Sequence, residues 1–142
     1  MRMEKRLVVD KPLKVVYDFL SDFTTTEAWD PGTVTTVRER GDGGVGTAYL
    51  NTSRFLGRET KLTYVVEERA ENQRIALRGE NETVIAHDTM DFRSTDGGTE
   101  VTYTAEFEFK GVTRFVAPLL RPALLRLGAK AETGIREALL KL

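Results

Sequence analysis

Hydrophobic and polar residues alternate through the middle of this chain, from residue 33 to residue 110, and this alternation constrains the fold more than any other feature. A period of two is typical of strands with one covered and one solvated face. The pattern predicts six strands, over residues 33–40, 46–55, 59–68, 73–79, 83–94 and 99–110. Only short turn sequences separate them. Neighbouring strands should therefore pair antiparallel as a meander, because a parallel crossover needs a dozen or more residues.

The segment before this meander predicts one strand and two short helices. Residues 3–9 indicate a strand. A helix should follow through about residue 22, with Asp10 as its N-cap and Pro12 in its first turn. Thr24 and Glu27 match a capping box, which predicts a second short helix that ends near Trp29.

The segment after the meander predicts a long amphipathic helix. Pro118 and Pro122 lie near its start and predict a bend or a restart there. Gly128 and Gly134 indicate either packing too close for a side chain or room for a ligand. The apolar face could also lie on a membrane, but we expect the inner face of the sheet to cover it. Apolar residues recur at spacings of three and four, at Val116, Leu120, Leu124, Leu127, Ala131, Ile135, Ala138 and Leu142.

Together these elements predict an α+β fold in a single domain over residues 1–142, with a curved antiparallel sheet of about seven strands around the last helix. The chain has no cysteine, which excludes disulfides, thiolate metal sites and cysteine nucleophiles. Its net charge of -1, with both signs mixed, argues against nucleic-acid binding. No stretch is apolar for long enough to predict a membrane span. We expect a cytoplasmic protein without a metal or cofactor, as a monomer or a homodimer.

The sequence Gly41-Asp42-Gly43-Gly44-Val45-Gly46 matches the spacing of a dinucleotide-binding loop. Such a loop must open a helix, whose N-terminus then binds the pyrophosphate. Here Thr47-Ala48-Tyr49-Leu50 continues as a strand. The sequence therefore predicts a hairpin turn rather than a nucleotide site.

Several short motifs, in their order along the chain, resemble the START-like superfamily, in its polyketide cyclase/dehydrase and lipid-transport branch. The resemblance implies a helix-grip fold with an apolar cavity between the sheet and the C-terminal helix, and small hydrophobic or aromatic ligands. It does not imply one reaction, because that superfamily has no shared catalytic motif. The motifs are Pro12 with Val16-Tyr17-Asp18-Phe19-Leu20, Glu27-Ala28-Trp29-Asp30-Pro31, Gly44-Val45-Gly46-Thr47, Leu56-Gly57-Arg58, Gly97-Gly98-Thr99, and Pro118-Leu119-Leu120-Arg121-Pro122 with Gly128.

The only histidine, His87, is followed directly by Asp88. On strand 83–94, Met90 and Phe92 set the inner face, so Asp88 should point inward and His87 outward. His87 and Asp91 share a face but lie about 13 Å apart along a strand. This spacing argues against a catalytic His–Asp pair and against a zinc site.

Asp88 is then a carboxylate on an apolar row. Burial would raise its pKa, which suits a general acid or base. We expect Asp88 to be a polar anchor in the cavity, near Asn51 or a tyrosine hydroxyl. The alternative is an aspartate at a frayed strand start or a bulge, facing water.

The remaining candidates for ligand contact also have structural alternatives. Trp29 could lie at the cavity mouth or in the core. Asn51 and Ser53 could line the cavity or turn outward at a bulge. Tyr64 and Tyr103 could orient a ligand or be core residues. The full candidate set is Trp29, Tyr49, Asn51, Ser53, Tyr64, Asp88, Met90, Tyr103, Phe107 and Leu127.

Three functions fit this sequence. The first is binding of a small hydrophobic or aromatic ligand in an internal cavity, and the absence of a convincing acid–base pair favours it. The second is a cofactor-independent cyclase or dehydratase in which Asp88 or a tyrosine moves a proton. The third is a module that binds a protein partner, although the outward rows look polar.

Overall fold

The computed structural model describes residues 1–142 as one seven-stranded antiparallel sheet with three α-helices. The strand order in the sheet is β1-β7-β6-β5-β4-β3-β2. The strands are β1 (Arg2–Val9), β2 (Thr33–Arg40), β3 (Ala48–Phe55), β4 (Arg58–Ala70), β5 (Arg74–Glu80), β6 (Val84–Thr95) and β7 (Gly98–Phe109). The helices are α1 (Leu13–Ser21), the 3-10 helix η1 (Phe23–Thr25), α2 (Thr26–Trp29) and α3 (Thr113–Leu140).

The sheet is the predicted meander, and one pairing between distant parts of the chain adds a seventh strand at its edge. Strands β2 to β7 pair with their neighbours in sequence, as the short turns predicted. The first strand, β1, pairs with the last, β7. Residues 41–47 form the turn between β2 and β3, and strand β3 follows directly. The glycine-rich sequence is therefore a hairpin turn, as predicted.

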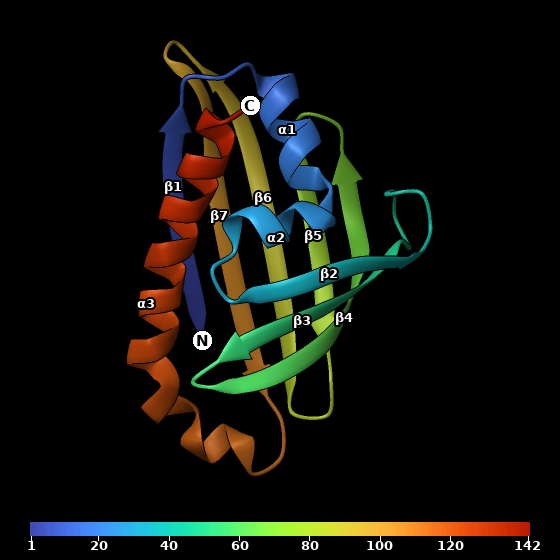
Figure 1. The fold of residues 1–142 in the computed structure, drawn as a ribbon, viewed down its shortest axis with the longest axis vertical. Helices are drawn as coiled ribbons and strands as arrows, with labels where there is room; N and C mark the ends of the chain where they lie inside the picture. Colours follow the sequence, from blue (N-terminus) through green and yellow to red (C-terminus); the bar gives the residue numbers. More distant parts are fainter.

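The sheet curls around the long helix (Figure 1). Strands β2, β3 and β4 run across the direction of β1, β7 and β6, and α3 lies along β1. The short helices α1 and α2 cover another part of the concave face. This arrangement is the predicted helix-grip fold.

Both predicted helix starts are wrong, and the structure gives the physical reasons. Pro12, not Asp10, is the N-cap of α1, and no side chain caps that helix. Asp22 caps η1, because its carboxylate accepts a hydrogen bond from the Thr24 amide at 3.0 Å. Glu27 makes no capping box, since its carboxylate accepts from the Thr36 amide of β2 at 2.9 Å. A tertiary contact has taken the place of the local one.

The long helix α3 bends near its start, as the two prolines predicted. Its first turns cross the lower end of the molecule in Figure 1 before the helix turns to follow β1. Farther along, Gly134 lies against α2, and a Cβ there would come within 2.0 Å of the Trp29 carbonyl oxygen. At Gly128 a Cβ would come within 2.8 Å of the Met3 sulfur. Both glycines therefore mark close packing.

The hydrophobic core occupies one end of the concave face. Its main cluster of 22 buried residues joins α1 and the C-terminal half of α3 to the sheet. A smaller cluster of Met3, Ala105 and Leu124 lies under the earlier part of α3. None of the helices is both long and apolar enough to cross a bilayer.

Candidate functional site

A cavity of about 440 Å³ lies between the sheet and residues 113–131 of α3. It occupies a part of the concave face that α1 leaves uncovered, and Leu62, Tyr64, Val84 and Ala131 of the main core cluster form part of its wall. Most of its inner wall is apolar, and the polar side chains inside it come from β3, β4, β6, β7 and the loop after α2. The principal lining residues are Asp30, Asn51, Ser53, Phe55, Leu62, Tyr64, Val84, Asp88, Tyr103, Phe107, Phe109, Leu120, Leu124, Leu127, Gly128 and Ala131.

The cavity opens between two hairpin turns. The exposed members of its lining are Arg54, Leu56 and Arg58 in the β3–β4 hairpin and Thr83 in the β5–β6 turn. The two arginines are also the only basic side chains in the lining. The mouth is thus basic, whereas the ionisable groups farther inside are carboxyls and phenols.

Seven of the ten predicted ligand-contact residues line this cavity. The side chain of Trp29 instead lies in the core, edge-on to Tyr103 with 5.6 Å between ring centroids. Tyr49 packs against Phe23, and Met90 is also in the core. None of these three residues lines the cavity. The residues that line it are Asn51, Ser53, Tyr64, Asp88, Tyr103, Phe107 and Leu127.

Asp88 points into the cavity from the middle of β6. Burial alternates strictly along this part of the strand, and the Asp88 side chain belongs to the inner row with only 9% of the residue exposed. Burial, together with the negative charge of Asp30, raises the pKa of its carboxyl to about 7. The Tyr103 hydroxyl lies within hydrogen-bonding reach and partly opposes this shift. At neutral pH the Asp88 carboxyl is therefore present in both its protonated and its ionised form.

Asp30 is the second carboxylate of the cavity, and it was not among the predicted site residues. It follows α2, where one carboxylate oxygen accepts from the Gly32 amide at 3.1 Å and the other from the Thr33 hydroxyl at 2.9 Å. Burial raises its pKa, and these two hydrogen bonds oppose the rise. Asp30 is also the C-cap residue of α2.

Two tyrosine hydroxyls complete the polar group around Asp88. Burial, together with the nearby carboxylate charge, holds the pKa of both Tyr64 and Tyr103 well above the usual range. Both phenols therefore stay protonated and can donate a hydrogen bond. The Tyr64 ring lies close over Gly79 of β5, where a Cβ would come within 2.6 Å of the ring. Gly79 thus provides the space that this ring occupies.

Asn51 lies on the inner face of β3, and the predicted alternative of a bulge in this strand is wrong. The bulges lie in the neighbouring strand β2. The Asn51 amide nitrogen donates to the Thr33 hydroxyl at 3.0 Å and to the Thr36 hydroxyl at 2.8 Å. Both of its donor hydrogens are thereby used within the sheet. What remains for a ligand is the side-chain oxygen, which can accept a hydrogen bond.

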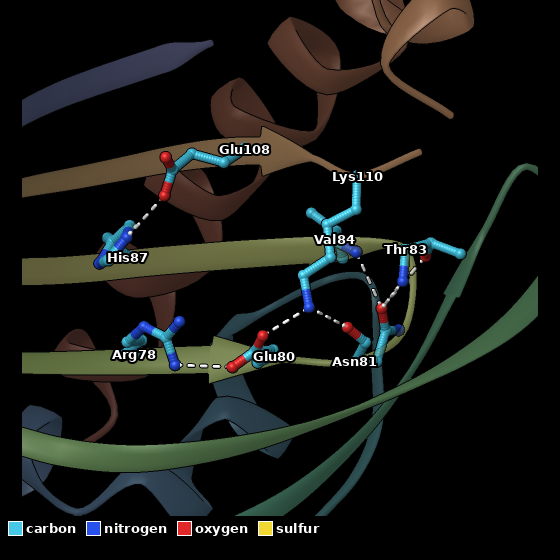
Figure 2. A network of polar contacts seen from close by, with 8 residues as sticks. All are labelled: Arg78, Glu80, Asn81, Thr83, Val84, His87, Glu108 and Lys110. Atoms are coloured by element: carbon cyan, nitrogen blue, oxygen red, sulfur yellow. Dashed lines mark hydrogen bonds and ion pairs between the residues drawn. The ribbon is translucent and has the colours of Figure 1, made fainter. Parts of the chain in front are cut away.

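His87 points to the opposite face of the sheet, as parity predicted. Its Nε2 lies 3.2 Å from a carboxylate oxygen of Glu108 on β7 (Figure 2). In the same region, Lys110 donates to the Glu80 carboxylate and to the Asn81 carbonyl. These bonds tie the segment that leads into α3 to the β5–β6 turn beside the cavity mouth.

The polar groups of the cavity offer acid–base chemistry. No group of three metal-ligating side chains comes together anywhere in residues 1–142. One carboxyl with a pKa near neutrality and two phenol donors face an apolar space. Such a set can orient a carbonyl or hydroxyl group and can exchange a proton with it.

Comparisons with known proteins agree with this fold. A model of the family described as polyketide cyclase/dehydrase and lipid transport matches residues 1–141. No curated protein matches the sequence.

Solved structures with the same fold share little sequence with this chain. The protein TTHA0849 from Thermus thermophilus has a TM-score of 0.84 at 15% identity, with 99% of this chain and 98% of that chain covered. The Zhui aromatase/cyclase from Streptomyces sp. R1128 has a TM-score of 0.83 at 14% identity, covering 99% and 94%. The di-domain ARO/CYC BexL has a TM-score of 0.73 at 14% identity, covering 97% of this chain and 49% of that one.

Proposed function

Because this chain belongs to the polyketide cyclase/dehydrase and lipid-transport family, we propose that its cavity binds a small hydrophobic or aromatic ligand, with Asp88 as the polar anchor. The observation that carries this proposal is the cavity itself. Its volume of about 440 Å³ is large enough for a small organic molecule. Its wall is mainly apolar, and Asp30, Tyr64 and Tyr103 lie near Asp88 inside it.

The polar groups suggest how such a ligand is oriented. A carbonyl or hydroxyl oxygen of the ligand would reach Asp88 and Tyr103, while its apolar part would contact Phe107 and Leu127. No basic side chain lies beside these two polar groups, so a ligand carboxylate would be repelled there. The favoured ligand is therefore neutral at its inner end.

The test is binding of a neutral fluorescent probe, N-phenyl-1-naphthylamine, to the wild type and to a variant with a filled cavity. Leu127→Trp places a large ring in the cavity, and we expect at least tenfold weaker binding. Leu125→Trp is the matched control, because Leu125 lies two residues away on an exposed part of α3. Equal affinity in all three proteins would place the probe outside the cavity and contradict the proposal. A separate experiment, native mass spectrometry of protein from its own host, would identify a retained ligand.

A second function, catalysis of a dehydration, is favoured by the acid–base character of Asp88. The Asp88 carboxylate would take a proton from the carbon between a carbonyl and a hydroxyl-bearing carbon, and a tyrosine hydroxyl would stabilise the enolate oxygen. The protonated carboxyl would then return that proton to the departing hydroxyl, which leaves as water. One double bond forms, and the carboxylate is regenerated.

The two functions differ in their dependence on Asp88. An Asp88→Asn variant should still bind the neutral probe, because the amide fills the same volume and keeps a hydrogen-bonding group. It should lose any dehydration activity, and the wild-type rate should fall as pH drops below about 7, where the carboxyl becomes protonated. Turnover that survives in Asp88→Asn would exclude this residue as the acid–base group.

A further inference from the structure

The first turns of α3 are not covered by the sheet. The sequence predicted that the inner face of the sheet covers the apolar side of this helix, but Val112 is 81% exposed, Phe115 71% and Leu119 80%. Val116, which the periodicity placed on the covered side, is 47% exposed. The physical reason is the bend near the two prolines, which directs these turns across the end of the molecule (Figure 1).

A further exposed leucine lies in the β3–β4 hairpin at the cavity mouth. Leu56 is 66% exposed and has a φ of 52°, followed by Gly57 at 79°. Positive φ at both turn positions favours asparagine, aspartate or glycine, and a leucine there is strained. This leucine thus costs conformational energy and is also poorly buried. The folded chain therefore gains little stability from a leucine at this position.

Basic residues accompany this apolar surface. Residues 109–131 contain five basic side chains and no acidic one, although the whole chain has 21 basic and 22 acidic residues. Arg58, Arg114 and Arg121 form no ion pair in the structure. The Arg114 guanidinium instead lies over the Phe115 ring, 4.9 Å from its centre. Of the five basic side chains in residues 109–131, only Lys110 has an acidic partner, Glu80, and the other four form no ion pair.

We propose that this mouth surface, defined as Leu56, Val112, Phe115, Val116 and Leu119 with the surrounding arginines, docks on an anionic lipid bilayer. Apolar side chains would enter the headgroup region while arginines contact lipid phosphates, as in interfacial amphipathic helices. The side chains protrude from two separate elements, and those from the start of α3 lie outside the cavity lining, which suits a deformable bilayer better than a folded partner. Docking would bring the mouth of the cavity to the membrane.

Docking is separable from ligand binding in the cavity. The mouth surface consists mainly of α3 side chains outside the cavity lining, and the polar group around Asp88 takes no part in it. If the protein binds vesicles but not the fluorescent probe, membrane docking is supported and ligand binding in the cavity is not. If it binds the probe but not vesicles, the proposed function is supported and membrane docking is not.

The test is co-flotation of the protein with phospholipid vesicles. We expect binding to phosphatidylcholine vesicles that contain about one third phosphatidylglycerol, weaker binding to phosphatidylcholine alone, and release on raising salt from about 0.05 M to about 0.5 M. Vesicle binding that depends on neither lipid charge nor salt concentration would overturn the proposal that the bilayer is recognised by its negative charge.

Apolar substitutions test which surface is in contact. Phe115→Ser combined with Leu119→Ser should weaken vesicle binding at least tenfold. Leu140→Ser is the matched control, because that leucine is also exposed but lies near the other end of α3. Leu56→Asn is the most discriminating variant: vesicle binding should fall while the melting temperature rises, since asparagine tolerates the left-handed turn. A fall in both would mean that Leu56 serves the fold.

Charge substitutions test the arginines. Arg114→Gln with Arg121→Gln should weaken binding by about fivefold for each arginine. Arg38→Gln with Arg40→Gln, on the exposed edge strand β2, is the control with the same change of net charge. If both pairs of substitutions weaken vesicle binding equally, binding depends only on the net charge of the protein, which would contradict the assigned surface. Self-association that the Phe115 and Leu119 substitutions abolish, without vesicle binding, would identify the surface as an interface between copies and overturn the proposal.

Discussion

The carboxyl of Asp88 should make the stability of this protein fall as pH rises, and Asp88→Asn should remove that dependence. The folded protein holds the Asp88 proton up to about pH 7, whereas the unfolded chain releases it near the ordinary pKa of 3.8. Between these pH values the folded state binds more protons than the unfolded state. The contribution of Asp88 to the free energy of unfolding therefore decreases from about pH 4 to about pH 7 and is constant above.

The size of this effect follows from the shift in pKa. Raising the pKa from 3.8 to about 7 corresponds to about 4 kcal/mol, at 1.36 kcal/mol for each unit. Protonated aspartic acid and asparagine are similar in shape and both neutral, so the two proteins should be about equally stable near pH 4. Near pH 8 the asparagine variant should be more stable by up to about 4 kcal/mol, since only the wild type then buries a charge.

Urea unfolding at several pH values between about 4 and 8 measures this difference. Asp96→Asn, in an exposed turn between β6 and β7, is the control for loss of one carboxylate. Asp30 is present in every protein, so its own contribution largely cancels in the comparison. A stability difference that stays flat across this range would refute the reasoning, because it would mean that the Asp88 carboxylate is solvated in the folded protein.

Two further substitutions test the packing around the site. Gly134→Ala should lower the free energy of unfolding by about 2–3 kcal/mol despite the better helix propensity of alanine, because its Cβ meets the backbone of Trp29. Gly128→Ala should cost less, since its nearest neighbour is the flexible end of Met3; similar losses in urea unfolding would contradict this explanation. Asn51→Leu should cost about 2 kcal/mol in the same assay, because the buried Thr36 hydroxyl and the partly buried Thr33 hydroxyl lose the donor that bonds them, and an unchanged midpoint would mean that they find other partners.

The sheet could be predicted from the sequence because its signal is local. Alternation along β6 was enough to put Asp88 on the inner face and His87 on the outer face, as the structure has them. The helix starts could not be predicted in this way. Glu27 has the right spacing for a capping box, but its carboxylate bonds to the Thr36 amide of a strand that a local pattern does not consider.

The sequence could predict which face of the sheet the cavity lies on, but not how far the cavity extends along that face. Parity put Tyr49 and Met90 on the inner face with Tyr64 and Asp88, and all four are buried. Only the latter two line the cavity, because the core that includes α1 fills the other end of the same face. Alternation says which side of a sheet a residue occupies, but it says nothing of what lies above it. Asp30 was missed as a site residue because it lies in a loop, where no such pattern applies.

The pairing of β1 with β7 has a consequence for how this chain folds. Strands β2 to β7 form hairpins between neighbours, and such contacts can form as soon as each strand is available. β1 must wait for β7, about a hundred residues later, as in the pairing of Leu7 with Val101. Until then one edge of β7 has no partner, and the chain exposes a strand edge that can pair with another molecule. We therefore expect the docking of β1 to limit the folding rate and the unpaired β7 edge to be the main route to aggregation.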